Sequence, residues 1–134
     1  MSGDFSAYRE KIDRIDDEIL RLLNERSKSV IEIGKLKKQK DADANLHTPA
    51  REAAIIERLT RQNPGPFPSE AIRPVYREIM SASLSLEGPQ KVAYLGPRAT
   101  FTHMASMQKF GSSAHYVPVN SIKDVFSEVE RGRA

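Results

Sequence analysis

The sequence predicts a mainly α-helical protein, in which three helices, the first very long, precede a short β-α-β-α segment. Apolar residues recur at spacings of three and four from Phe5 to Ile33, and Pro- and Gly-rich breaks divide residues 41–90 into two shorter stretches. Residues 91–134 alternate between β-prone and helix-prone runs. Spacings of three and four are typical of one helix face, and alternating strands and helices indicate a parallel α/β sheet. We therefore expect two domains, at 1–90 and 91–134.

The first helix is expected at about residues 5–40. This range contains no Pro and a single Gly, Gly34. Its apolar face is formed by Phe5, Tyr8, Ile12, Ile15, Ile19, Leu22, Val30 and Ile33, with Arg26 in the same row. A helix of about 35 residues is roughly 50 Å long. Because a chain of 134 residues cannot cover such a helix alone, we expect a partner chain to pack along it.

Two shorter helices are expected at about 49–62 and 70–87. The segment 41–45 breaks the apolar pattern and indicates a loop. Thr48 then has the character of an N-cap, followed by Pro49 at the first helical position. The second helix should turn Ile55, Ile56 and Leu59 inward before Asn63-Pro-Gly-Pro ends it. The third should turn Ile72, Tyr76, Ile79, Ser83 and Leu86 inward, with Pro74 near its start and Gly88-Pro89 at its end.

The remaining chain predicts strands at 91–96 and 115–119 and helices at 100–110 and 121–131. This order implies two parallel strands, each followed by a helix. Two strands do not make an independent α/β domain. Residues 91–134 are therefore expected to be the truncated opening of a second domain.

The composition excludes several classes of site. The chain has no Cys, which excludes disulfides, thiolate metal sites and Cys nucleophiles. Its three histidines, His47, His103 and His115, show no metal-binding spacing and are expected in loops or on the surface. No apolar run approaches the roughly 18 residues that span a bilayer. We therefore expect a cytoplasmic protein with no metal and no contact with membranes.

Nucleic-acid binding is also not expected. The net charge is +3, and acids are interspersed among the basic residues. The one basic cluster, at 35–40, is more typical of a solvated helix end that compensates the helix dipole.

Charged residues interrupt the apolar faces of all three expected helices. They are Arg9, Arg26 and Lys37 in the first helix, Arg51 and Glu52 in the second, and Glu87 in the third. A single Arg such as Arg26 is more typical of a snorkelling side chain or a rim salt bridge. Lys37 alone would be a solvated residue at a helix end, and Arg51-Glu52 alone would be ordinary surface charges in a first helical turn. Charged side chains are rarely buried without a partner. Together, in matched phase on three helices, these residues indicate an anionic ligand that is not part of the chain.

The same residues carry a resemblance to a known family. Residues 8–26 (YREKIDRIDDEILRLLNER), 31–37 (IEIGKLK) and 48–52 (TPARE) closely resemble the all-α chorismate mutases. Residues 91–97 (KVAYLGP) and 100–105 (TFTHMA) resemble the start of prephenate dehydratase. A mutase joined to a dehydratase is the layout of the bifunctional P-proteins of phenylalanine biosynthesis. The tail departs from that pattern at 98–99, where Arg-Ala replaces the usual Glu-Gly and loses the freedom of glycine in the turn.

The resemblance implies an intertwined all-helical homodimer and a set of site roles. Arg26 and the partner's Arg9 would hold the two carboxylates of chorismate. Lys37 and Glu87 would donate hydrogen bonds to its ether oxygen. Arg51, Ser83, Glu52 and the backbone at Thr48 would complete the pocket, with Glu52 accepting from the ring hydroxyl. Some family members have Asp at the place of Thr48 and Gln at the place of Glu87.

The implied chemistry agrees with the residues present. Conversion of chorismate to prephenate is an intramolecular rearrangement that needs no nucleophile, metal or cofactor. An enzyme can supply conformational restraint and electrostatic stabilisation, and Arg suits a carboxylate clamp. Arg9 and Arg26 lie 17 residues apart, roughly 25 Å along one helix. One small substrate cannot contact both in one subunit, so an antiparallel partner helix must bring Arg9 across, giving two equivalent sites.

Two other classes of function account for parts of the sequence. A non-catalytic helical dimerisation module fused to a ligand-binding domain predicts the same long helix, but gives no reason for Lys37, Glu52 and Glu87 to converge. A nucleic-acid-binding helical protein is favoured only by the basic cluster at 35–40 and the basic isoelectric point.

Overall fold

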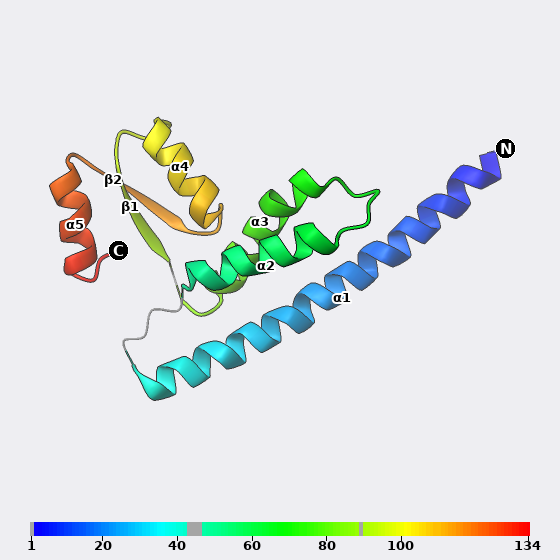
Figure 1. Cartoon of the computed structure of the whole chain (residues 1–134), viewed down its shortest axis with the longest axis horizontal. Helices are drawn as coiled ribbons and strands as arrows, with labels where there is room; N and C mark the ends of the chain where they lie inside the picture. Colours follow the sequence, from blue (N-terminus) through cyan, green and yellow to red (C-terminus); the bar gives the residue numbers. More distant parts are fainter. Residues whose placement is uncertain (1, 43–46, 89) are drawn as a thin grey trace.

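The computed structural model describes residues 2–42, 47–88 and 90–134, with side chains from residue 4 onward. Helix α1 runs from Ser2–Lys40 and α2 from Pro49–Gln62. A short 3-10 helix, η1 at Ser69–Ala71, leads into α3 at Ile72–Ser85. Figure 1 shows α2 and α3 side by side along part of α1, with the N-terminal end of α1 projecting beyond them. The three predicted helices are thus confirmed; the loop predicted at 41–45 lies outside the described residues beyond Ala42.

Two details at the helix ends differ from the prediction. Thr48 is the N-cap residue of α2 with Pro49 following it, but its side chain makes no capping hydrogen bond. Helix α3 ends at Ser85 rather than at 87, because the N–H groups of Leu86 and Glu87 bond to carbonyls three residues back. Such tightening of a last turn is common at helix C-termini. It places Glu87 in a turn and not on the helix.

The core of the helical unit is small. Ile55 and Ile56 of α2 pack with Met80 of α3, and Leu59 and Tyr76 cover them. Ile55 and Ile56 were predicted inward and are buried.

The inward face predicted for α3 is only partly correct. Ser81 and Met80 are buried, whereas Leu86 is 56% exposed. Ser81 is buried because residues 112–113 of the α/β segment cover α3 on a second side. Leu86 lies in the turn that follows the end of α3.

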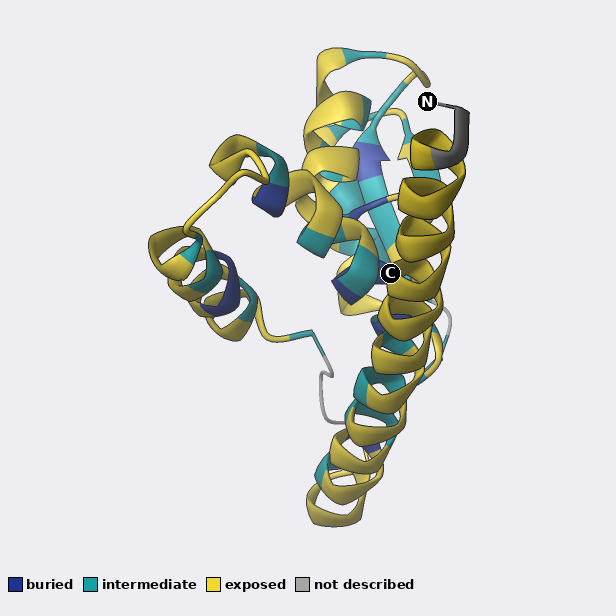
Figure 2. Ribbon diagram, turned by 90° about the vertical axis from the view of Figure 1, so that its right-hand side faces the viewer, coloured by how far each residue is buried: buried dark blue, intermediate teal, exposed yellow. Residues whose placement is uncertain are grey.

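The first half of helix α1, unlike α2 and α3, has no buried side chain among its described residues. Every described side chain from Asp4 to Leu22 is exposed, and burial begins only with Leu23. Figure 2 shows this half of the helix entirely in the colour of exposed residues. The apolar face predicted from the sequence is therefore present, and within the described chain nothing covers its first half.

The rest of the chain is a small α/β unit. Strands β1 (Lys91–Leu95) and β2 (His115–Val119) pair in parallel, with Lys91 opposite His115. Helices α4 (Phe101–Phe110) and α5 (Ile122–Glu130) follow the strands, which confirms the predicted order. Thr100 and Ser121 cap these helices through their side-chain oxygens. The apolar face predicted for α5 stays largely uncovered, since Ile122, Phe126 and Val129 are exposed.

The α/β unit contacts the helical unit where α4 ends. The backbone N–H of Ser112 donates to both carboxylate oxygens of Glu78, at 3.1 and 3.2 Å, and the N–H of Ser113 donates to Ser81 Oγ at 3.2 Å. Gly111 has φ of 76°, and a Cβ there would lie 2.5 Å from the Cβ of Ser81. Both facts require glycine at this position.

Candidate functional site

A cavity of about 290 Å³ lies among α1, α2 and the end of α3. Seven of the residues singled out from the sequence line it, namely Arg26, Lys37, Thr48, Arg51, Glu52, Ser83 and Glu87. Ser29, Val30, Ile33, Ile55, Met80 and Leu84 also line the cavity. Arg9 is not among the lining residues and lies on the exposed first half of α1.

Arg26 is held in place by α3. Its Nη1 donates to Ser83 Oγ at 3.3 Å, and Ser83 Oγ donates in turn to the carbonyl of Ile79 at 2.8 Å. Because the Ser83 proton is used by the backbone, the hydroxyl presents a lone pair to the guanidinium. Ser83 is only 5% exposed. Helix α3 therefore orients Arg26 while leaving most of its donors available.

The cavity has an excess of positive charge. Three of its lining residues are cations (Arg26, Lys37, Arg51) and two are carboxylates (Glu52, Glu87). Within residues 2–42, 47–88 and 90–134, no carboxylate lies within ion-pair distance of these three cations. Arg26 and Lys37 are partly buried, whereas Arg51 is exposed. Partly buried cations without a carboxylate partner favour an anionic ligand.

Glu87 faces this group of cations from the turn after α3. Burial raises the pKa of Glu87, while the ammonium groups of Lys37 and Lys38 act in the opposite direction. Lys38 Nζ also donates to the backbone carbonyl of Glu87 at 3.1 Å, which ties the turn to α1. A raised pKa increases the fraction of Glu87 that is protonated and able to donate a hydrogen bond.

Gly34 provides the space for the Glu87 side chain. A Cβ at Gly34 would lie 2.7 Å from Glu87 Oε1 and 2.8 Å from its Cδ. Glycine inside a helix costs about 1 kcal/mol relative to alanine. The sequence signal was this single glycine in a long helix, but its role becomes visible only from its contact with Glu87.

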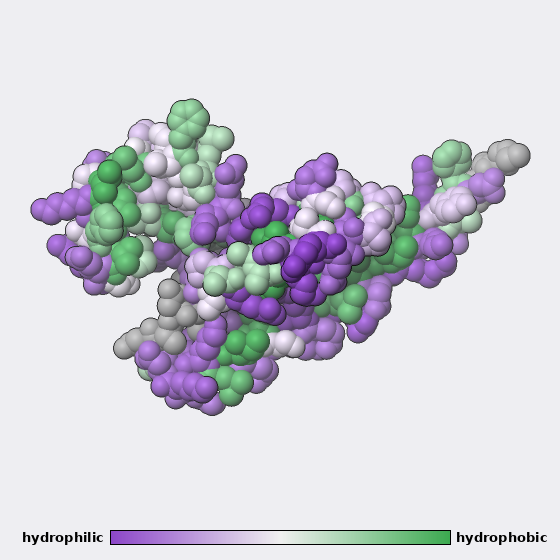
Figure 3. All heavy atoms as spheres, in the orientation of Figure 1, coloured by the Kyte–Doolittle hydropathy of each residue, from purple (hydrophilic) through white to green (hydrophobic). Residues whose placement is uncertain are grey.

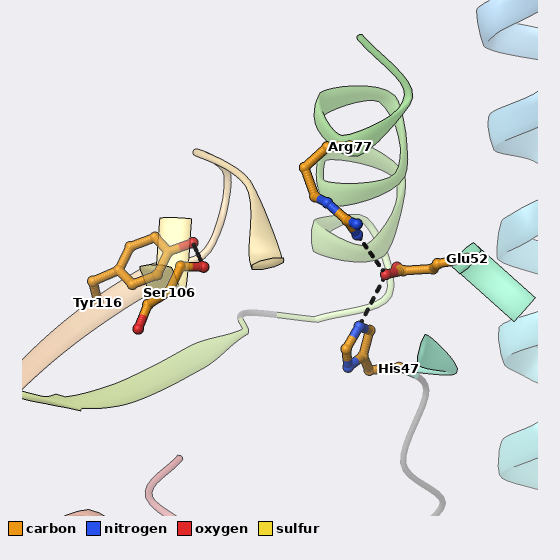
Figure 4. A network of polar contacts seen from close by, with 5 residues as sticks. All are labelled: His47, Glu52, Arg77, Ser106 and Tyr116. Carbon is orange, nitrogen blue, oxygen red and sulfur yellow. Dashed lines mark hydrogen bonds and ion pairs between the residues drawn. The ribbon is translucent and has the colours of Figure 1, made fainter. Parts of the chain in front are cut away.

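The carboxylate of Glu52 has polar contacts with two residues that the sequence did not identify as part of the site. Arg77 Nη1 donates to Glu52 Oε1 at 2.9 Å, and His47 Nε2 lies 3.1 Å from the same oxygen. All three side chains are at most 16% exposed. Figure 4 shows Glu52 reaching from α2 toward both partners. Arg77 precedes Met80 by three residues, a spacing that places it on the buried side of α3.

The expectation that the histidines lie in loops or on the surface is wrong for His103, which is partly buried in a helix; His47 does lie in the loop before α2 but is largely covered there. The side chain of His47 is 12% exposed and its ring lies 5.1 Å from that of Phe110. His103 lies within α4 and stacks on Tyr94 at 4.7 Å. Both rings are covered by aromatic side chains that come from distant parts of the sequence.

The described residues contain no group of three or more His, Cys, Asp or Glu side chains arranged to hold a metal ion. In the same part of the chain, no helix combines the length and the apolar character needed to cross a membrane.

The fold and the cavity have the features of a helical protein that binds a small anion: cations from α1 and α2 line the cavity, and the end of α3 closes it with Ser83 and Glu87. Comparison with known proteins identifies the family. The chain belongs to the type II chorismate mutases, whose family model matches residues 8–88. Residues 92–134 match the prephenate dehydratase family.

Curated relatives carry both names. A bifunctional chorismate mutase/prephenate dehydratase of Aquifex aeolicus is 55% identical over 94% of this chain, and one of Neisseria gonorrhoeae is 42% identical over 95%. The chain spans only about a third of the length of these relatives, 35% and 34% respectively. A chorismate mutase structure from Thermus thermophilus is 47% identical, with a TM-score of 0.57; the match covers 62% of this chain and 92% of that one.

Proposed function

We propose that residues 1–90 form a chorismate mutase domain, which rearranges chorismate to prephenate in a pocket shared between two chains. The observation that supports this most strongly is the cavity itself. It combines three cations that have no carboxylate partner among the described residues with a Glu87 whose pKa is raised by burial. A substrate with two carboxylates and an ether oxygen needs both kinds of group.

The reaction breaks the ether C–O bond and forms a C–C bond within one molecule, so no atom enters or leaves. The barrier falls when the flexible enolpyruvyl group is held folded over the ring. Arg26 and the partner's Arg9 are proposed to bind the two carboxylates. The fixed orientation of Arg26 against Ser83 supports this role, because a preorganised guanidinium loses less entropy on binding.

Lys37 and protonated Glu87 are proposed to donate to the ether oxygen. Negative charge develops on that oxygen as the C–O bond breaks. Donors placed there bind the transition state more tightly than the ground state, which is the requirement for raising kcat. Lys37 and Glu87 both line the cavity and interact electrostatically.

The other lining residues are proposed to fix the ring. Glu52 would accept from the ring hydroxyl, near the backbone of Thr48, while Arg51 would contribute positive charge from α2. A non-catalytic dimerisation module remains the alternative, but it gives no reason for these polar groups to surround one cavity.

The exposed half of α1 supports a homodimer. Phe5 and Tyr8 are 69% exposed, and Ile12, Ile15, Ile19 and Leu22 are each about half exposed. Figure 3 shows apolar side chains lying along α1 between charged ones. A contiguous apolar row of this length is typical of a protein interface. An antiparallel partner would cover the row and bring its Arg9 to Arg26.

The dehydratase activity in the relatives' names is not proposed for these 134 residues. Residues 91–134 contribute two strands and two helices, and α5 leaves Ile122 and Phe126 exposed. We expect this segment to need additional β-strands before it can form a cleft for that chemistry.

The test of the proposed activity is loss of chorismate, followed by ultraviolet absorbance, with the purified chain in the presence of a metal chelator. We expect turnover without any added cofactor. Absence of turnover in a folded dimer would overturn the proposal.

A further inference from the structure

The end of α4 lies against His47 and against α3, the helix that carries Arg77. The ring of Phe110, the last residue of α4, lies 5.1 Å from the ring of His47 at an interplanar angle of 52°. Shortly after it, the backbone N–H groups of Ser112 and Ser113 donate to Glu78 and Ser81, on the same helix as Arg77. A Cβ at Gly111 would lie 3.3 Å from the carbonyl oxygen of Arg77. The α/β unit is therefore in contact with His47 and with the helix that carries Arg77, the two residues that hold Glu52.

The two carboxylate oxygens of Glu52 have different surroundings. Its Oε1 accepts from Arg77, and His47 Nε2 must also donate to it, since an ionised carboxylate only accepts. Its Oε2 accepts no hydrogen bond within the described part of the chain. Because Glu52 lines the cavity, Oε2 remains available to a ligand hydroxyl.

Arg77 also balances charge. A carboxylate in the wall of a pocket for a dianion would repel it, and the ion pair with Arg77 offsets that repulsion. Arg77 is not a lining residue, so it acts on a ligand only through Glu52.

We propose that His47, Arg77 and Phe110 are positioning residues for Glu52, so that the α/β segment supports the substrate-binding wall of the mutase pocket. This inference rests on the proposed function. It assigns to residues 91–134 a role in chorismate binding that is separate from any dehydratase chemistry. A hydrogen bond from the ring hydroxyl is present in both ground and transition states. Losing the support should therefore raise KM and leave kcat nearly unchanged.

The test compares Phe110→Ala with Phe101→Ala in the full chain, using chorismate as substrate. Phe101 opens the same helix and is 89% exposed, so it controls for loss of a phenylalanine from α4. We expect Phe110→Ala to raise KM about three- to tenfold, the range for one hydrogen bond, with kcat within about twofold. Phe101→Ala should change neither. Equal behaviour of the two variants, or a fall in kcat without a change in KM, would overturn the inference.

A second measurement separates positioning from general damage. In a Glu52→Gln background, Phe110→Ala should raise KM by less than about twofold, because the group it positions has already been altered. An undiminished effect would show that Phe110 acts elsewhere.

If Phe110→Ala fails to fold, His47→Gln and His47→Leu decide the matter. Only Gln keeps a donor, so only Leu should raise KM, and equal KM values would contradict the inference. An inactive wild type would instead overturn the proposed function.

Discussion

Gly34→Ala should lower the activity of the protein without lowering its stability. The new Cβ would lie 2.7 Å from Glu87 Oε1, 2.8 Å from Cδ and 3.1 Å from Cγ. These atoms belong to a flexible side chain, so Glu87 can move aside at little cost. Alanine meanwhile favours the helix by about 1 kcal/mol over glycine. The free energy of unfolding should therefore stay constant within about 1 kcal/mol or increase.

Turnover should nevertheless fall. Complete loss of one preorganised donor lowers kcat by about 10²–10³. Because Gly34→Ala displaces Glu87 without removing it, we expect kcat to fall by about tenfold to a hundredfold, which is less than for complete loss of the donor. The assay is initial-rate chorismate consumption alongside urea unfolding. Lys35→Ala, at an exposed neighbouring position, is the control.

The effect should also disappear when Glu87 is absent. Adding Gly34→Ala to Glu87→Ala should lower kcat by less than about twofold further, since the two changes act through one group. Normal turnover in Gly34→Ala, or a large additional loss in the double variant, would refute the assignment of Gly34 as the residue that makes room for Glu87.

Three further predictions concern single residues. Glu87 donates only when protonated, and burial raises its pKa, so turnover should fall as pH rises through that pKa; Glu87→Gln should flatten this alkaline limb, and identical pH–rate profiles would contradict the role. Lys37→Ala should lower kcat by about 10²–10³, and near-normal turnover would exclude it as the ether-oxygen donor. Ala99 has φ of 64°, a conformation that disfavours alanine relative to glycine, so Ala99→Gly should stabilise the chain against urea by roughly 0.5–1 kcal/mol; an unchanged or lower stability would refute this.

Much of the secondary structure could be predicted because it depends on local patterns. The spacing of Phe5, Ile12 and Ile19 predicts a helix whatever packs against it, and Thr48-Pro49 marks a helix start from its own chemistry. The same periodicity predicted that Arg26 and Lys37 point to the side of Ile33, where the cavity lies.

What escaped prediction depends on contacts between distant segments. His47 and Arg77 meet Glu52 only because α2 and α3 pack together, and Phe110 reaches His47 only because the α/β unit contacts α3. Periodicity predicts one inward face for α3, but the helix is covered from two sides, so the burial of Ser81 does not follow from that pattern. Periodicity gives the direction of a side chain and not the identity of its partner.

The central claim, a pocket completed by a second chain, is tested most directly by complementation. Arg9→Ala and Arg26→Ala chains, each inactive alone, would be unfolded together and refolded at equal concentration. A heterodimer has one site with both arginines, and half the dimers are heterodimers, so we expect about one quarter of wild-type activity. Arg26→Ala mixed with Lys37→Ala should recover nothing, because those two residues belong to the same subunit's site. No recovery in verified Arg9/Arg26 heterodimers would contradict the shared pocket.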